Sequence, residues 1–229
     1  FLLNRSSDLA RQKVATQMGS MGATIMYMGS RPPPAGGPAG VITEEDLAAL
    51  ASLPEVARVM PVIGDPISVR RGNMERNLYV FAGTEAMPRM HHWPVAVGRF
   101  FSAREDDDLA PLVVLGHKAR MHFFPDGADP IGQHLLIGTA PFEVIGVISE
   151  RGAESGSQDY DDMVFIPYRA GRARVYRAQT QPDYTVIEAA GSAQVLAAEQ
   201  AIHRLLLDRH GREDFGIGNA AAKLQAEQE

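Results

Sequence analysis

Cysteine is absent from all 229 residues of the chain. Its absence excludes disulfide bonds, and it also excludes metal sites that are built on thiolate ligands. Cysteine usage is the common sequence clue to the redox state of a compartment. The chain therefore gives no indication, from this source, of the side of a membrane on which it works.

Long apolar runs are missing as well. No stretch of about 18 apolar residues occurs, and no basic segment precedes a shorter apolar one, so we find neither a transmembrane span nor a signal peptide in this sequence. The chain starts at Phe1 without Met, and helical patterns run from Leu3 to Met21 and from Asn219 to Glu229. We expect these two helices to be cut in mid-course and the chain to be excised from a longer protein.

The chain also lacks an excess of basic residues. It has 22 Lys and Arg against 28 Asp and Glu, which gives a formal net charge of −6. Binding to nucleic acid without regard to sequence needs clustered Lys and Arg, so we exclude that class of function. The length allows one large domain or two modest ones, and the 45% apolar content suffices for their cores.

Catalytic motifs are also missing. No glycine-rich phosphate loop occurs, and Ser155 does not form a nucleophile elbow because Ala153 and Ser157 stand where glycines are needed. We therefore expect no catalytic residue and no cofactor-binding residue. The chain is predicted neither to bind nucleotide nor to turn over a substrate.

Three groups of residues invite a metal site, and each has a plainer interpretation. His91 and His92 would point to opposite faces of a strand, so we expect them on a surface at a domain boundary. His117 and His122 lie five residues apart, which does not fit the spacing of four in zinc-binding helices. The acidic run 105–108 lacks the glycine spacing of a calcium loop and is predicted to be a solvated turn. No metal ligand is predicted.

The N-terminal part has the pattern of a strand, a helix and further strands. Thr43 with Asp46 three residues later forms the sequence signature of a capping box, so a helix should begin there and end before Pro54. A Pro- and Gly-rich loop precedes this helix. Strands are expected at Thr24–Met28, Val56–Ile63, Ile67–Arg70 and Leu78–Ala82, with a polar hairpin turn between the last two.

The same order of elements recurs near the other end. A strand at Tyr184–Ala189 precedes a helix that opens at Ser192 and is capped by Gly211, and a short strand follows at Phe215–Ile217. Each end alone is too small to bury both faces of a sheet, so the two ends should share one. The sequence predicts an α+β fold with two subdomains, residues 1–90 with 182–229 and an insertion of residues 91–181.

The insertion is predicted to be mostly β. Within the segment DPIG, Pro130 fixes φ, Asp129 can accept a local backbone N–H, and Gly132 permits a conformation closed to other residues. This turn should aim the strands that follow it. The polar segment 151–162 is expected to be a mobile loop that orders on contact with a partner. Strands are expected at Leu112–Leu115, His134–Ile137, Phe142–Ile148 and Met163–Ile166.

The order of short motifs is more specific than any one of them. GRFF, VVLG, DPIG, VIGV and DDMVFIPY follow one another from residue 98 to residue 168, and LPEVARVMPVIG and HGREDFGIGN flank them. In this order and spacing the sequence resembles the periplasmic core domain of MacB-type ABC permeases over nearly its whole length. The residues of these motifs that we assign a structural role are Gly98, Phe100, Phe101, Asp129, Pro130, Gly132 and Gly146.

The resemblance implies an architecture and a function. The two chain ends would form a porter-like α/β sheet subdomain, and the insertion would be sabre-like. The chain would lie on the periplasmic face of the bacterial inner membrane and transmit ATP-driven conformational change to a tripartite efflux assembly. Its partners would be a periplasmic adaptor of the membrane-fusion type, an outer-membrane exit duct and a second permease copy. ATP would bind to a nucleotide-binding domain of the parent transporter, with no cofactor in this chain.

Two other functions stay open at this point. An ectodomain of a lipoprotein-releasing permease should carry a protruding loop that hands cargo to a soluble carrier. A regulatory ectodomain that activates a cell-wall hydrolase should show an exposed apolar patch. In the intact transporter the transmembrane helices would hold two copies together, so we expect the isolated chain to be a monomer at micromolar concentration.

Overall fold

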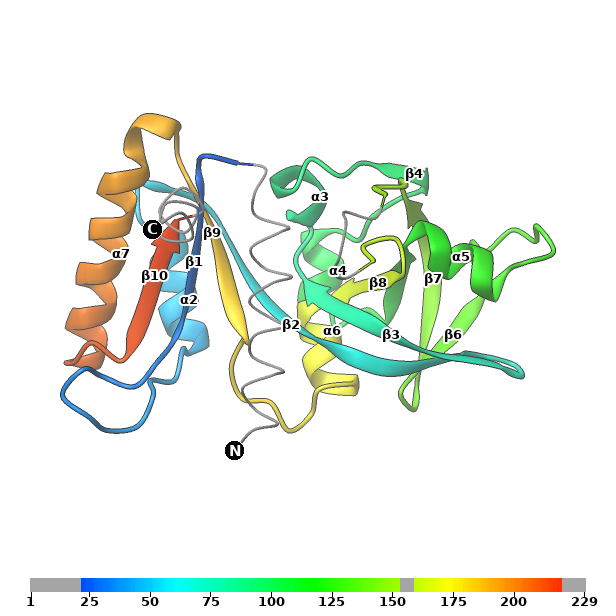
Figure 1. The fold of residues 1–229 in the computed structure, drawn as a ribbon, viewed down its shortest axis with the longest axis horizontal. Coiled ribbons are helices and arrows are strands. Elements are labelled where there is room, and N and C mark those ends of the chain that lie inside the picture. The colour runs from blue at the N-terminus through cyan, green and yellow to red at the C-terminus, as the bar shows by residue number, and fades with distance from the viewer. Residues whose placement is uncertain (1–21, 153–158, 220–229) are drawn as a thin grey trace. The chain divides into compact units, whose positions relative to one another are not determined.

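The computed structural model describes residues 22–152 and 159–219 (Figure 1). The chain divides into two compact units, with boundaries at Pro61/Val62 and Thr180/Gln181. The first unit takes the described residues before Val62 and after Thr180, and the second unit is Val62–Thr180. The helices expected over 1–21 and 220–229, and the centre of the polar loop at 153–158, lie outside the described residues.

The first unit is built on strand β1 (Ile25–Ser30), which pairs along both edges with strands from the far end of the chain. β9 (Tyr184–Ala189) is antiparallel to it on one side, and β10 (Phe215–Asn219) is antiparallel to it on the other. Met28 lies opposite Thr185 in β9 and opposite Ile217 in β10. These pairings confirm that the two chain ends share one sheet.

Helices α2 (Glu44–Ala51) and α7 (Val195–His210) bury their apolar faces in the core of this unit (Figure 1). The predicted capping box at the start of α2 is confirmed. The N–H of Asp46 donates to the Thr43 hydroxyl at 3.1 Å, and the N–H of Thr43 donates to the Asp46 carboxylate at 3.0 Å. Two of the four free N–H groups at this helix end are thereby satisfied.

The entry and exit of α7 are also set by local sequence. A turn of 3₁₀ helix, η1 (Ser192–Gln194), leads into it, and Gly211 ends it with a φ of +75°. That left-handed conformation is the predicted glycine cap. The buried side chains that join both helices to the sheet are Met26, Met28, Leu47, Leu50, Ile187, Ala198, Ile202, Leu206 and Phe215.

The described residues of the second unit form seven strands and four short helices. The strands are the end of β2 (Val56–Arg71), β3 (Met74–Gly83), β4 (Val95–Gly98), β5 (Leu112–Leu115), β6 (His134–Ile137), β7 (Ala140–Ile148) and β8 (Met163–Pro167). The helices are α3 (Met87–Met90), α4 (Ala103–Asp107), α5 (His117–Phe123) and α6 (Tyr168–Arg174). Among the described residues, no helix of either unit is long and apolar enough to cross a membrane.

Strand pairing in the second unit closes into a ring. The hydrogen-bonded order is β2-β3-β8-β5-β7, and β6 then pairs with both β7 and β2. Closure satisfies the backbone groups that an open sheet would leave at its two edges. The ring encloses a core of its own, which includes Ile63, Val80, Val113, Phe123, Phe142, Val144, Val164 and Ile166.

Strand β2 differs from the prediction. Two strands were expected, at Val56–Ile63 and Ile67–Arg70, because Gly and Pro stand between them in residues 64–66. The structure has one strand of 16 residues, since pairing with β3 continues through this segment. Alternate residues of an antiparallel pair turn their N–H away from the partner, so a proline fits there. The predicted polar hairpin turn narrows to Gly72 and Asn73.

The boundary between the units also lies elsewhere than the sequence indicated. The prediction assigned all residues up to Met90 to the first subdomain, whereas the structure groups Val62–Met90 with the second unit. The reason is long-range pairing: β3 lies between β2 and β8, and β8 comes from the middle of the chain.

Two glycines allow the backbone of β4 to lie close against β7. Gly98 has a φ of +69°, and the N–H of Arg99 donates to the Ile145 carbonyl at 3.1 Å. A Cβ on Gly98 would lie 2.2 Å from the Ile145 carbonyl oxygen, and a Cβ on Gly146 would lie 2.2 Å from that of Arg99. Both contacts are with backbone atoms, which cannot rotate away. Glycine is therefore required at both positions.

We expect Gly146→Ala to lower the free energy of unfolding by about 1–3 kcal/mol, the usual cost of forcing an extra methyl group into a packed site. Gly191→Ala is the matched control, because a Cβ at Gly191 would meet no atom within 4 Å. Urea unfolding of the three proteins tests this. An unchanged midpoint for Gly146→Ala would contradict the close approach of β4 and β7.

Candidate functional site

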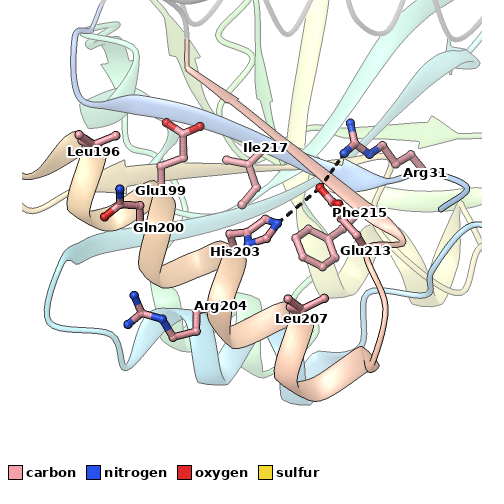
Figure 2. A pocket seen from close by; sticks show the side chains of 10 residues that line it. All are labelled: Arg31, Leu196, Glu199, Gln200, His203, Arg204, Leu207, Glu213, Phe215 and Ile217. Atoms are coloured by element: carbon pink, nitrogen blue, oxygen red, sulfur yellow. Dashed lines mark hydrogen bonds and ion pairs between the residues drawn. The ribbon is translucent and has the colours of Figure 1, made fainter. Parts of the chain in front are cut away.

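A groove in the first unit runs between α7 and β10 (Figure 2). Its volume is about 720 Å³, and the described residues of this unit alone line it. One wall is a face of α7, and the other comes from β10 and the residues beside it. The lining side chains are Arg31, Leu196, Glu199, Gln200, His203, Arg204, Leu207, Glu213, Phe215 and Ile217.

Helix α7 presents this face because its sequence has apolar residues on more than one side. Ile202 and Leu206 point into the core and are fully buried. Leu196 and Leu207 lie outside that stripe and remain 67% and 37% exposed. Exposed leucines at both ends of one groove form an apolar surface that a partner can cover.

A small polar network crosses the middle of the groove. The Glu213 carboxylate accepts a hydrogen bond from the Arg31 guanidinium at 3.0 Å, and the Nε2 atom of His203 lies 3.4 Å from the same oxygen (Figure 2). The His203 ring packs against Phe215, with 5.4 Å between ring centroids. Glu199 makes no hydrogen bond or ion pair with any residue in the described ranges, and its carboxylate extends from α7 away from Glu213 (Figure 2).

A buried ionic cluster lies at the C-terminal end of α7. His210 is held between two carboxylates: its Nδ1 atom is 2.6 Å from Asp214, and its Nε2 atom is 2.8 Å from Asp46. The Arg209 guanidinium donates to the second oxygen of Asp46 at 2.6 Å. Only the protonated imidazolium can donate from both ring nitrogens, so the geometry favours a charged His210.

The pKa values follow from this geometry. Burial lowers the pKa of His210, but hydrogen bonds to Asp46 and Asp214 outweigh burial and hold that pKa above its ordinary value. Burial likewise raises the pKa of Asp46, while hydrogen bonds from Arg209, the Thr43 backbone and His210 bring that pKa below its ordinary value. Their side chains are at most 9% exposed, so water screens these interactions weakly.

The cluster fixes the start of β10. The Asp214 carbonyl accepts hydrogen bonds from the N–H groups of Arg31 at 2.9 Å and Gly40 at 3.0 Å. A Cβ on Gly40 would lie only 2.5 Å from the Asp214 carboxyl carbon, so glycine is needed for this approach. Asp214, which immediately precedes Phe215, thus ties the start of β10 to α7 and to the loop before α2. The position of one groove wall depends on it.

The histidines and acids considered as metal ligands lie in other surroundings than expected. His91 ends helix α3 instead of lying in a strand, where its N–H donates to the Met87 carbonyl, and it is buried instead of on a surface. His92 follows in the left-handed region, with a φ of +49°. His117 and His122 lie on α5, a short helix as expected. In residues 22–152 and 159–219, no three His, Asp or Glu side chains are grouped to hold a metal ion.

The acidic run 105–108 is not a solvated turn. Most of it belongs to helix α4, which begins with a capping box between Ser102 and Glu105. Asp106 is buried and accepts a hydrogen bond from the Arg169 N–H at 3.0 Å. Burial raises the pKa of Asp106 to about 6. The capping signature was present in the sequence, but the partner on α6 was not visible there.

The residues assigned a structural role all lie in the second unit. The Asp129 carboxylate accepts the Ile131 N–H at 3.0 Å, and Gly132, at a φ of +87°, donates its N–H to Val144 at 2.8 Å. The DPIG turn, with Pro130 at its centre, is thereby joined to β7. The rings of Phe100 and Phe101 stack at 4.3 Å, and Phe101 is buried. None of these residues lines the groove beside α7.

Sequence reasoning missed the groove. Its lining comes from residue 31 and from residues 196–217, which meet only after the ends of the chain pair. A signal was present in α7: Leu196, His203 and Leu207 recur at helical spacing on a side other than the buried stripe. That second stripe indicates a helix that has two apolar sides.

Comparison with known proteins gives consistent results. A sequence profile described as the MacB-like periplasmic core domain matches residues 7–205. The macrolide export ATP-binding/permease protein MacB of Nitrosomonas europaea is 67% identical over 219 residues, which are 96% of this chain and 33% of that protein. The pyoverdine export ATP-binding/permease protein PvdT of Pseudomonas entomophila is 40% identical over 95% of this chain and 33% of its own length. The chain thus spans about a third of these relatives.

Solved structures share the fold at low sequence identity. The periplasmic region of MacB from Actinobacillus actinomycetemcomitans has a TM-score of 0.76 at 19% identity, covering 91% of this chain and 94% of that one. The extracellular domain of the transporter YknZ from Gram-positive bacteria has a TM-score of 0.70 at 18% identity, covering 85% of this chain and 100% of that one. These matches agree with a mixed fold of a large sheet and few helices.

The ionic cluster predicts a pH dependence of stability. The folded-state pKa of His210 is raised, so its contribution to stability is complete below the ordinary value of 6.5 and is lost as the pH rises through the folded value. His210→Gln removes the charge and should lower the free energy of unfolding by about 1–3 kcal/mol at pH 6, and by less at pH 9.

Urea unfolding of wild type and His210→Gln at pH 6, 7.5 and 9 measures this difference. The partly exposed His122→Gln, on α5 of the second unit, is the control and should follow the wild type at each pH. A difference between His210→Gln and wild type that stays constant from pH 6 to 9 would show that His210 is not charged in the folded protein.

Proposed function

Since this chain belongs to the MacB-like periplasmic core domain family, we propose that it transmits ATP-driven conformational change to a tripartite efflux assembly and docks a periplasmic adaptor. It is the periplasmic domain of a MacB-type ABC transporter permease. The observation that carries the proposal is the 67% identity to a macrolide export permease over 96% of this chain. The matched relatives are named as export ATP-binding/permease proteins.

The two units of the domain have different parts in the proposed motion. We propose that the first unit is porter-like and the second sabre-like. The closed strand order of the second unit resists deformation, because bending it would break pairings on both sides of each strand. The chain passes between the units twice, at Pro61/Val62 and at Thr180/Gln181. A stiff unit held by two backbone connections can move as one body and carry displacement to a partner.

Export is the cellular role that the relatives support. Their names give macrolide and pyoverdine as exported compounds, and ATP binding as a property of the whole proteins. We propose that the parent of this chain is likewise an inner-membrane exporter, with ATP bound outside this domain. The adaptor, an outer-membrane exit duct and a second permease copy would complete the assembly. The formal charge of −6 adds mild repulsion between free copies, consistent with a monomer in isolation.

The test uses the free chain as a competitor. The intact transporter is reconstituted in liposomes with a periplasmic adaptor of the membrane-fusion type from the same organism, and ATP hydrolysis is measured with and without the adaptor. If the chain docks the adaptor, an excess of free chain should remove the adaptor-dependent part of the ATPase rate. The basal rate should stay unchanged, because the free chain does not touch the nucleotide-binding domain.

An unrelated acidic protein of similar size, added at the same concentration, controls for nonspecific effects on the liposomes. Adaptor-dependent hydrolysis that persists at saturating free chain would contradict adaptor docking by this domain.

A further inference from the structure

In the described part of the chain, strand β10 pairs along only one of its two edges. It pairs with β1 on one side, and within residues 22–152 and 159–219 no strand pairs with its other side. Exposed edges in natural proteins are commonly protected by charged side chains, proline or a bulge. Phe215–Gly218 carries none of these, because it consists of two apolar residues alternating with glycine.

The backbone groups on this edge can be assigned from the strand register. The N–H of Arg31 donates to the Asp214 carbonyl at 2.9 Å, so residues 214, 216 and 218 turn their backbone groups toward β1. The N–H of Ala189 donates to the Thr24 carbonyl at 2.9 Å, so residues 24, 26 and 28 turn their backbone groups toward β9. The residues between them then face β10, which agrees with the assignment above. The N–H and C=O groups of Phe215 and Ile217 therefore point outward.

The free edge lies beside the groove described above. Phe215 and Ile217 contribute side chains to the groove and to the core under α7. Gly216 and Gly218 carry no side chain on the opposite face, where Arg31 packs against Gly216. A strand added to β10 would place every second side chain in the groove, next to Leu196 and Leu207. The edge supplies main-chain hydrogen bonds, and the groove can select the side chains.

We propose that β10 is the docking edge for an extended segment of the periplasmic adaptor, which adds to the sheet as a further strand. This proposal rests on the adaptor docking proposed above. Charge complementarity specifies the segment: it carries apolar side chains at alternate positions, and a Lys or Arg that faces Glu199, which has no ionic partner among the described residues. Glu213 does not offer the same contact, because Arg31 already neutralises it at 3.0 Å.

Ile217→Pro tests the backbone contact, since it removes an outward N–H without removing a hydrogen bond to β1. Ile217→Val is the matched control, because it keeps the N–H and an apolar side chain. Binding of the adaptor to the immobilised 229-residue chain is measured for each. We expect Ile217→Pro to weaken binding about tenfold or more and Ile217→Val to bind like wild type.

Glu199→Arg tests the charge at a partly exposed position on α7. It removes no hydrogen bond to any described residue, so it tests the proposal even if Ile217→Pro fails to fold. It should also weaken binding about tenfold. Amide exchange followed by NMR gives a direct readout: the adaptor should slow exchange at Phe215 and Ile217, which are unpaired in the free chain. A contact through side chains alone would not protect these two amides in alternation.

The outcomes separate this proposal from the preceding one. If wild type binds the adaptor but Glu199→Arg and every folded edge variant bind equally well, strand addition is wrong and adaptor docking stands. If wild type itself does not bind the adaptor, both are wrong. Loss of binding in the variants with protection at Phe215 and Ile217 supports both.

Discussion

The antiparallel pairing of β1 with both β9 and β10 is the interaction on which the first unit depends. Six residues near the start of the chain hold two strands that follow more than 150 residues later. Closing so long a loop costs conformational entropy, and the pairing is supported by burial of α2 and α7 on the sheet. Once the chain ends are joined in this way, the residues between them can form a separate unit with its own core.

The ionic cluster around His210 determines how β10 begins. A histidine between two buried carboxylates would be unfavourable if it were neutral, because one ring nitrogen could not donate. In its charged form it joins α2, α7 and the residue before β10 at distances of 2.6 and 2.8 Å. The groove and the free edge of β10 are consequences of that placement. The surface we propose for docking is therefore held by a buried electrostatic interaction.

The second unit is held together by a different arrangement of strands. Its strands are short, and several belong to parts of the chain that are far apart, yet the ring of pairings leaves few backbone groups without a partner. Glycine at positions 98 and 146 lets two backbones meet where a methyl group would collide with a carbonyl oxygen. The DPIG turn holds the chain against β7 through Gly132. These residues do no chemistry, and they are among the motifs that carry the family resemblance.

Local features of the protein were determined by the sequence itself, because they depend on neighbours within a few residues. The capping box at Thr43, the glycine cap at Gly211 and the strands Leu112–Leu115, His134–Ile137 and Tyr184–Ala189 have the predicted positions. The ordered series of short motifs was likewise enough to indicate the family. Only the tertiary structure decided that β2 is one strand, that Asp106 and His91 are buried, and that a groove lies beside an unpaired edge of β10. Each of these features depends on pairing or packing between segments that are far apart in the chain. A hydrophobic pattern indicates that a residue is buried, but it does not indicate which distant residues it packs against.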